Sequence, residues 1–354
     1  MITYVGIFTG LALLELSIPD RRNLPTMIGI ALFLIWFMGT RYIVGCDFKA
    51  YYLRYVEILP GLHFDEIFSR QEPGFELLAS LLKTMGAHYM WLKITTAILM
   101  VIGYYVFARA NRSPVMIMAL LFPVIVVQLG MSGIRQGVAT SALMLASVAF
   151  LKGNRLMTGL IIILGAQFHN SAYIFLPIAF LAGRRINAGR IIAGVLLLSP
   201  LAVYLLSDRL EVYSERYVEQ AYGEITSRGA LIRYALIMLP YLFFLRYYKD
   251  LRAAYPEAYN LLKLFAIICF ALLPVALYSS IALHRINFYV MPFSILTFVY
   301  LSLAIAPRQQ ALLIRAVPAL LYGLYQVFWF LTSSHAAECY DPYRSFSFLM
   351  LSGA

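Results

Sequence analysis

The sequence predicts an all-α, polytopic membrane protein, and three observations lead to this class. The 354-residue chain is 62% hydrophobic and only 13% charged, and its mean hydropathy is +0.78. A soluble globular domain carries roughly 25% charged residues. Long apolar runs recur along the chain, and in lipid only a helix satisfies the backbone polar groups of a run of about 20 residues. We therefore expect residues 1–354 to form a single integral membrane domain.

About ten full spans are expected in a transmembrane helical bundle. The first is expected to be retained with its start outside, because no basic stretch precedes it and Asp20-Arg21-Arg22 follows it. No internal repeat relates the two halves of the chain, so an inverted-repeat transporter gains no support. The expected spans lie near residues 2–18, 25–44, 89–108, 114–131, 136–152, 190–206, 229–247, 258–282, 286–306 and 315–333.

Residues 157–182 are expected to form a helical hairpin or re-entrant element instead of a further span. The segment is apolar except for Gln167 to Ser171 at its centre, and polar side chains in lipid are costly. The short connections rich in Arg and Lys share the cytoplasmic side only if this segment enters and leaves by the same face. Two shorter helices meeting at His169, or a broken re-entrant element, meet that condition.

Two longer connections are expected on the outer side, at residues 45–88 and 207–228. Within the first, Pro73 stands at an early helical position and apolar residues follow at helical spacing. This pattern predicts an amphipathic helix near residues 72–86 that lies at the membrane interface. Cys46 and Cys339 could meet on this side, although nothing in the sequence demands a disulfide.

The composition and the missing motifs exclude several function classes. The net charge of +11 does not indicate nucleic-acid binding, because many Lys and Arg residues stand in short connections where they set orientation. The sequence has no Gly-rich nucleotide loop, Asp-x-Asp pair, His-x-x-Glu-His, Cys cluster or Gly-x-Ser-x-Gly. We expect no metal and no cofactor. A site of arginines and carboxylates at the outer surface is what the sequence offers.

Arg135 is the most informative charge in the chain. It stands between two apolar runs in Gly133-Ile-Arg-Gln-Gly137, where glycines allow close approach and a helix start adds partial positive charge. A planar guanidinium in such a place suits a phosphate or diphosphate. For the other arginines near span ends, snorkelling to lipid headgroups is an equal alternative. The candidate diphosphate ligands are Arg135, Arg41, Arg285, Gln136 and Arg233.

Glu72, Asp47 and His169 are the candidates for a general base. A carboxyl beside apolar surface has a raised pKa, which suits it for proton transfer. Glu72 could equally be the first-turn acid of its helix, and Asp47 could pair with Arg41. His169 could instead be a hydrogen-bonding residue between helices. All three alternatives stay open from the residues alone.

Four residues are candidate substrate contacts. Tyr51 and Tyr55 could stack on sugar rings, or could belong to the aromatic belt at the membrane interface. Asn170 follows His169 at the centre of the broken segment, and His284 lies between two expected spans.

Four short motifs follow one another along the first half of the chain. They are Arg41-Tyr-Ile-Val-Gly-Cys-Asp47 with Tyr51 and Tyr55 after it, Glu72-Pro-Gly-Phe-Glu76, Gly133-Ile-Arg-Gln-Gly-Val-Ala139, and Gln167-Phe-His-Asn-Ser-Ala172. In this order they resemble the EpsG family, whose members are Wzy-like polymerases of exopolysaccharide and O-antigen repeat units. The resemblance covers residues 35–180 well, and the second half matches mainly in its span pattern and in Arg285-Ile-Asn-Phe-Tyr289.

The resemblance implies a GT-C-like glycosyltransferase in the bacterial inner membrane. It would transfer a growing glycan from an undecaprenyl-diphosphate donor to an incoming lipid-linked repeat unit at the periplasmic face, without metal. Arg135, with Arg41 and Arg285, would neutralise the leaving diphosphate, and Glu72, Asp47 or His169 would take the proton of the acceptor hydroxyl. Membrane lipids, and in some such systems a chain-length regulator, would be its other partners.

Two other functions stay open at this point. An O-antigen ligase-type transferase or an acyltransferase would use a similar lipid-diphosphate site. A ligase is expected to carry a large late outer loop, however, and the longest late loop here is residues 207–228. A lipid-linked-glycan flippase or other transporter predicts polar residues near the membrane midplane and internal repeats, and the sequence shows neither.

Overall fold

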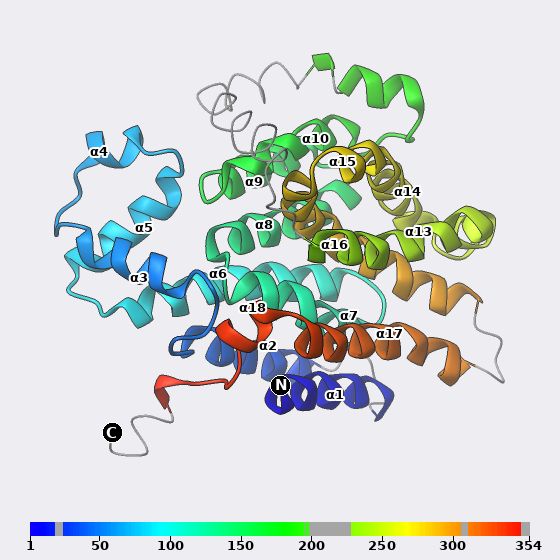
Figure 1. Ribbon diagram of the computed structural model, residues 1–354. Helices are drawn as coiled ribbons and strands as arrows, with labels where there is room; N and C mark the ends of the chain where they lie inside the picture. The colour runs from blue at the N-terminus through cyan, green and yellow to red at the C-terminus, as the bar shows by residue number, and fades with distance from the viewer. Residues whose placement is uncertain (18–23, 195, 198–227, 306–310, 348–354) are drawn as a thin grey trace. The chain divides into compact units, whose positions relative to one another are not determined.

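The computed structural model describes residues 1–17, 24–194, 196–197, 228–305 and 311–347 (Figure 1). Every named regular element in these ranges is a helix, which confirms the all-α prediction. The helices coincide with the apolar runs of the sequence, because a helix pairs its backbone polar groups internally and leaves only side chains to face lipid.

The first half of the chain contains twelve of these helices, if the irregular ones are counted. They are α1 (Ile2–Ser17), α2 (Leu24–Gly39), α3 (Phe48–Glu57), α4 (Phe64–Ser69), α5 (Pro73–Thr84), α6 (Tyr89–Ala110), α7 (Pro114–Leu121), the π-helix η1 (Phe122–Gly130), α8 (Ile134–Leu151), α9 (Arg155–Ala166), the 3-10 helix η2 (Asn170–Phe175) and α10 (Pro177–Leu181). The second half contains α13 (Arg228–Ala254), α14 (Pro256–Ala271), α15 (Leu273–Tyr278), α16 (Ser280–Ile305), α17 (Ala311–Thr332) and α18 (Ser334–Cys339).

Six helical segments of the described residues are long and apolar enough to cross a membrane, so the chain is a multi-pass membrane protein. They are Tyr89–Ala110, Ile134–Leu151, Gly229–Ala254, Pro256–Leu277, Ser280–Ile305 and Leu313–Thr332. The expected count of about ten is not confirmed, because the runs near 2–18, 25–44 and 114–131 form shorter apolar helices. The expected span at 190–206 and the expected loop at 207–228 lie for the most part outside the described residues.

Internal contacts divide the chain into two compact units. Unit 1 contains Met1–Leu145, Leu164–Asn170 and Ala319–Ala354, and unit 2 contains Ala146–Ile163 and Ser171–Pro318. In unit 1, α2 packs along α6 and α1 packs along α7. In unit 2, α13 and α14 both pack against α16. The single integral membrane domain stays a prediction.

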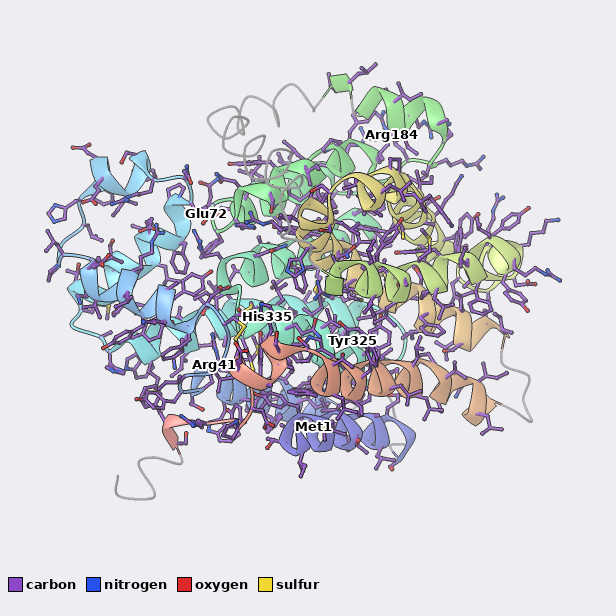
Figure 2. The ribbon with its side chains drawn as sticks, in the orientation of Figure 1. Met1, Arg41, Glu72, Arg184, Tyr325 and His335 are labelled. Carbon is purple, nitrogen blue, oxygen red and sulfur yellow. A yellow bond between two sulfur atoms is a disulfide. The ribbon has the colours of Figure 1, made fainter. Side chains whose placement is uncertain are left out.

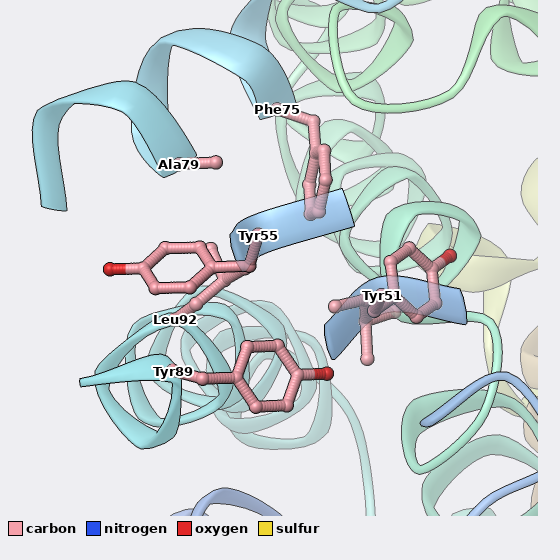
Figure 3. Close-up of a cluster of buried hydrophobic side chains, with 7 residues drawn as sticks. Tyr51, Tyr55, Phe75, Ala79, Tyr89 and Leu92 are labelled. Carbon is pink, nitrogen blue, oxygen red and sulfur yellow. The ribbon is translucent and has the colours of Figure 1, made fainter. Parts of the chain in front are cut away.

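The connection expected at residues 45–88 is mostly helical and consists of α3, α4 and α5 in unit 1. The helix predicted near residues 72–86 is present as α5. Its apolar residues Phe75 and Ala79 are buried against Tyr51, Tyr55 and Tyr89 (Figure 3). That face of α5 therefore packs on α3 and α6 instead of on lipid, because the aromatic side chains of these two helices supply the apolar partner.

The C-terminal segment of unit 1 is tied to the connection that follows α2. Cys339, at the end of α18, forms a disulfide with Cys46, visible as a yellow bond in Figure 2. Arg41 also pairs with Ser345 as an isolated antiparallel bridge. The disulfide that the sequence left open is thus formed, and it fixes the end of the loop that leads into α3.

The segment expected to form a hairpin is broken as predicted, into α9, η2 and α10. Its two ends lie together in unit 2, because a Cβ added to Gly183 would lie 3.1 Å from the Cα of Gly153. Both glycines have positive φ, +72° and +70°, which ordinary residues rarely adopt. Arg155 Nε donates to the carbonyl of Ala182 at 3.1 Å. The segment therefore enters and leaves at the same place, which agrees with the hairpin inferred from the basic connections.

Candidate active site

Glu72 is the centre of the candidate site in unit 1. It is the N-cap residue of α5, because Pro73 fixes the first helical position after it. Its side chain is 7% exposed, and its two carboxylate oxygens have different partners. Oε2 accepts from Arg135 Nη1, and Oε1 lies 2.6 Å from Nδ1 of His169. Figure 2 labels Glu72 at this position.

His169 reaches Glu72 because the break between α9 and η2 lies directly against the start of α5. The backbone N–H of Gly74 donates to the carbonyl of Gln167 at 3.0 Å. A Cβ at position 74 would lie only 2.8 Å from the Cβ of Gln167, so glycine is needed for this approach. A carboxylate only accepts hydrogen bonds, so the proton in the bond to Glu72 is on Nδ1. In the neutral imidazole, Nε2 of His169 then carries the lone pair.

Arg135 lies in the first turn of α8 and bridges Glu72 to α3. Its Nε donates to the hydroxyl of Tyr51 at 3.3 Å, and its guanidinium lies over the rings of Tyr51 and Phe75, 5.6 and 5.8 Å from their centroids. The Arg135 side chain is 31% exposed while its partner Glu72 is nearly buried. Among the described residues, Nη2 of Arg135 has no hydrogen-bond partner, so the exposed edge of the guanidinium can bind an anion.

The electrostatics of Glu72 differ from the sequence-based expectation. Burial alone raises the pKa of its carboxyl, but the hydrogen bond and charge of His169, together with those of Arg135, outweigh burial and hold the pKa below its ordinary value. Glu72 is therefore a carboxylate that orients its partners. For Tyr51, burial raises the pKa of the phenol despite the neighbouring Arg135, so its hydroxyl stays protonated.

Gln136, Asn170 and Tyr55 lie on the same elements as the residues of this site or directly beside them in the sequence. Gln136 is buried beside Arg135 in α8, and Asn170 opens η2 directly after His169. Tyr55 donates its hydroxyl to the carbonyl of Ala87 at 2.7 Å and is buried in the aromatic cluster of Figure 3. Its ring supports α3 from behind the site.

Arg41 and Asp47 have other contacts in unit 1. Arg41 is 2% exposed, and its partners among the described residues are backbone carbonyls. Its Nε donates to Met131 at 3.1 Å and to Val44 at 3.3 Å, and its Nη1 donates to Met38. It therefore stabilises the loop after α2. The carboxylate of Asp47 accepts from Ser132 Oγ at 3.0 Å and does not pair with Arg41. This contact joins the start of α3 to the turn that leads into α8.

Arg233, His284 and Arg285 belong to unit 2. The Nη1 of Arg233 lies 2.9 Å from Nδ1 of His284, and its guanidinium lies 4.5 Å from the ring centroid of Phe288. Arg285 is the next residue after His284 on α16. Arg233 and His284 thus contact each other in unit 2, and Arg285 is adjacent to His284 in the sequence.

The close approach expected at the glycines around Arg135 is present at Gly137. A Cβ there would lie 2.5 Å from Sδ of Met100 and 3.6 Å from the Cα of Gly130. A second ion pair beside the site, Arg54 with Glu76, was missed by the sequence analysis. The signal for it was the spacing of Glu72 and Glu76, four residues apart on α5. Within the described residues no group of three or more potential metal ligands occurs.

Comparison with known protein families supports the sequence resemblance. The model of the EpsG family matches residues 26–345, which is nearly the whole chain. No curated protein and no solved structure matches this chain.

Proposed function

This chain belongs to the EpsG family, which indicates a polysaccharide polymerase-type membrane protein, and from that premise we propose the reaction and its residues. The proposed activity joins undecaprenyl-diphosphate-linked oligosaccharide repeat units into a longer glycan. The observation that supports it best is that one buried carboxylate, Glu72, holds both an arginine with an exposed edge and a histidine with an available lone pair. A glycosyl transfer from a lipid diphosphate needs these two groups together.

In the proposed reaction a hydroxyl oxygen of the acceptor sugar attacks the anomeric carbon of the donor glycan. The new carbon–oxygen bond forms as the bond to the diphosphate oxygen breaks, and the lipid diphosphate leaves with the bonding electron pair. Nε2 of His169 accepts the hydroxyl proton. Glu72 keeps the ring in the correct tautomer through Nδ1 and stabilises the imidazolium that forms, as a carboxylate does in other histidine-based sites.

Arg135 has the second role in the proposal. Negative charge grows on the diphosphate as the glycosidic bond breaks, and a positioned guanidinium stabilises that charge most where water is excluded. Removing one such preorganised group from an active site costs roughly 100- to 1,000-fold in rate. Asn170, Gln136 and Tyr51 are proposed as neighbouring substrate contacts. Arg41 and Asp47 are proposed to hold the surrounding loops. In unit 2, Arg233 and Arg285 stay predicted diphosphate ligands, and His284 stays a predicted substrate contact.

The proposed site faces the periplasm. Support comes from the disulfide between Cys46 and Cys339, because disulfides form and persist in oxidising compartments and are rare in the cytosol. Cys46 immediately precedes Asp47, which contacts the turn leading to Arg135. The disulfide and the candidate site are thus expected at the same membrane face, where the lipid-linked units are proposed to be joined.

The test is turnover by the purified full-length protein in lipid nanodiscs, supplied only with its undecaprenyl-diphosphate-linked repeat unit. The wild-type protein is expected to produce a ladder of longer glycans. His169→Gln should slow ladder formation by roughly 100- to 10,000-fold, the usual contribution of a general base. His63→Gln is the matched control, because His63 is exposed at the start of α4. A wild-type protein that makes no ladder contradicts the function, and an unimpaired His169→Gln variant contradicts the base.

A further inference from the structure

The ion pair between Arg54 on α3 and Glu76 on α5 is not used by the reaction proposed above. It lies beside the pair between Arg135 and Glu72. Glu72 is the N-cap of α5, and its backbone carbonyl accepts a hydrogen bond from the N–H of Glu76 at 3.2 Å. The two acids are therefore one turn apart at the start of α5 in unit 1.

The other side of the contact gives the same placement. Tyr51 and Arg54 are three residues apart on α3 and so share one face of that helix. Tyr51 accepts the hydrogen bond from Arg135 Nε, while Arg54 binds Glu76. Helix α3 thus contacts both ion pairs, through Tyr51 at Arg135 and through Arg54 at Glu76.

The two ion pairs also share an unequal exposure. The Glu76 side chain is 9% exposed and that of Arg54 is 40% exposed, and the pair of Glu72 with Arg135 has the same pattern, with 7% and 31%. In each pair a nearly buried carboxylate binds an arginine whose side chain is partly exposed to solvent. The pair of Arg70 with Glu66 within α4 differs, because both of its side chains are more than half exposed.

The available hydrogen-bond donors match a phosphorylated ligand. An arginine offers five N–H donors in a planar fork. Only Nη2 of Arg54 has a hydrogen-bond partner in the described structure, and that partner is Glu76. Two partly exposed guanidinium groups that both contact α3 offer separate donors to the two phosphoryl groups of a diphosphate, whose greater span and charge use both groups more fully than a single phosphate does.

We propose that Arg54 and Arg135 together form a diphosphate-binding clamp, with Glu76 as the positioning residue for Arg54. The identity of the diphosphate as the lipid-linked leaving group rests on the proposed function. The existence of the clamp does not rest on the proposed function, because its binding of an inorganic diphosphate can be measured without turnover.

The experiment measures binding of inorganic pyrophosphate to the full chain in nanodiscs by calorimetry, with a chelator present. Arg54→Gln is expected to weaken pyrophosphate binding by roughly tenfold or more, because it removes charge-assisted hydrogen bonds to a phosphoryl group. The same variant should change orthophosphate binding much less. Arg70→Gln removes an arginine of similar exposure on the neighbouring helix and should leave pyrophosphate binding unchanged.

Glu76→Gln distinguishes two roles of the ion pair, the binding of a diphosphate by Arg54 and the structural attachment of α3 to α5. Both Arg54→Gln and Glu76→Gln break the ion pair, but only the first removes the cation. The clamp predicts a much larger loss of pyrophosphate affinity in Arg54→Gln, and a purely structural pair predicts equal losses, which would overturn the inference. Pyrophosphate binding that depends on Arg54 in a protein that makes no glycan ladder would support the clamp and contradict the proposed function, so the two failures are distinguishable.

Discussion

The carboxylate of Glu72 has two partners of different kinds, and this arrangement determines which residue moves the proton. The sequence predicted a raised pKa for a carboxyl beside apolar surface, but His169 and Arg135 lower it. A carboxylate held ionised by an arginine is a poor proton acceptor at neutral pH and a good orienting group. The imidazole on its other oxygen is the better base, because its second ring nitrogen is available to accept a proton.

The lowered pKa of Glu72 predicts how stability depends on pH. Because the folded pKa lies below the unfolded one, the ionised carboxylate contributes stability that is fully present above the ordinary pKa of Glu, about 4.3, and is lost as the pH falls through the folded pKa. The melting temperature of the wild-type protein should therefore fall steeply below about pH 4. Glu72→Gln should flatten this fall, as measured by thermal unfolding in detergent across the acid range.

Glu66→Gln is the control for the pH experiment, since Glu66 is exposed in its pair with Arg70 on α4 and exposed pairs contribute little. It should keep the wild-type dependence. Equal slopes for Glu72→Gln and the wild type would show that Glu72 does not have the lowered pKa.

Sequence reasoning placed Glu72, Arg135 and His169 near one another, but it could not identify their contacts. Each was noticed because a charge or polar group stood at the end of an apolar run. Which groups pair depends on the close approach of Gly74 to Gln167, and no local pattern encodes that approach. Arg54 was missed for the same reason, because its partner Glu76 comes from another helix.

At the scale of elements, the broken segment α9–η2–α10 was predictable and the environment of α5 was not. The hairpin followed from counting basic connections, a signal that depends only on sequence. Helical periodicity predicted an apolar face on α5, but the same periodicity fits burial against lipid or against protein. The aromatic residues of α3 and α6 cover that face, and their proximity is a property of the tertiary fold.

The disulfide between Cys46 and Cys339 joins residues 293 positions apart in the sequence, and its predicted effect is testable. In protein isolated from intact cells without reductant, a maleimide reagent should label neither cysteine. After reduction both should be labelled, and stability should fall by about 2–4 kcal/mol, as expected for loss of a disulfide. Peptide mapping and thermal unfolding measure the two effects.

Cys269→Ser is the control for the disulfide experiment. Cys269 is a free and buried thiol in unit 2, so its replacement should leave the labelling pattern of the other two cysteines unchanged. Labelling of Cys46 without reductant would contradict both the disulfide and the placement of the site on an oxidising face.

For the whole molecule, composition was sufficient to predict a helical membrane protein. It was not sufficient to predict the number of spans. The runs near 2–18 and 25–44 contain 16 helical residues each within the described part of the chain, as α1 and α2, and residues 18–23 between them lie outside that part. The run near 114–131 changes from an α-helix to a π-helix at Phe122, immediately before Pro123. Hydropathy measures the length of an apolar run, and helix ends depend on such local backbone features.

The central proposal is that Glu72 and His169 act as one unit in glycan transfer. A double-mutant cycle on the turnover rate in nanodiscs tests it most directly, with Glu72→Gln, His169→Gln and the combined variant. Residues that act as a unit are not additive, because the first substitution already removes the function that the second would impair. We predict that the loss in the combined variant is much smaller than the product of the two single losses, since only the contact of Glu72 with Arg135 is left to lose once His169 is replaced. Losses that multiply in the combined variant would show that the two residues act separately and would contradict the proposed site.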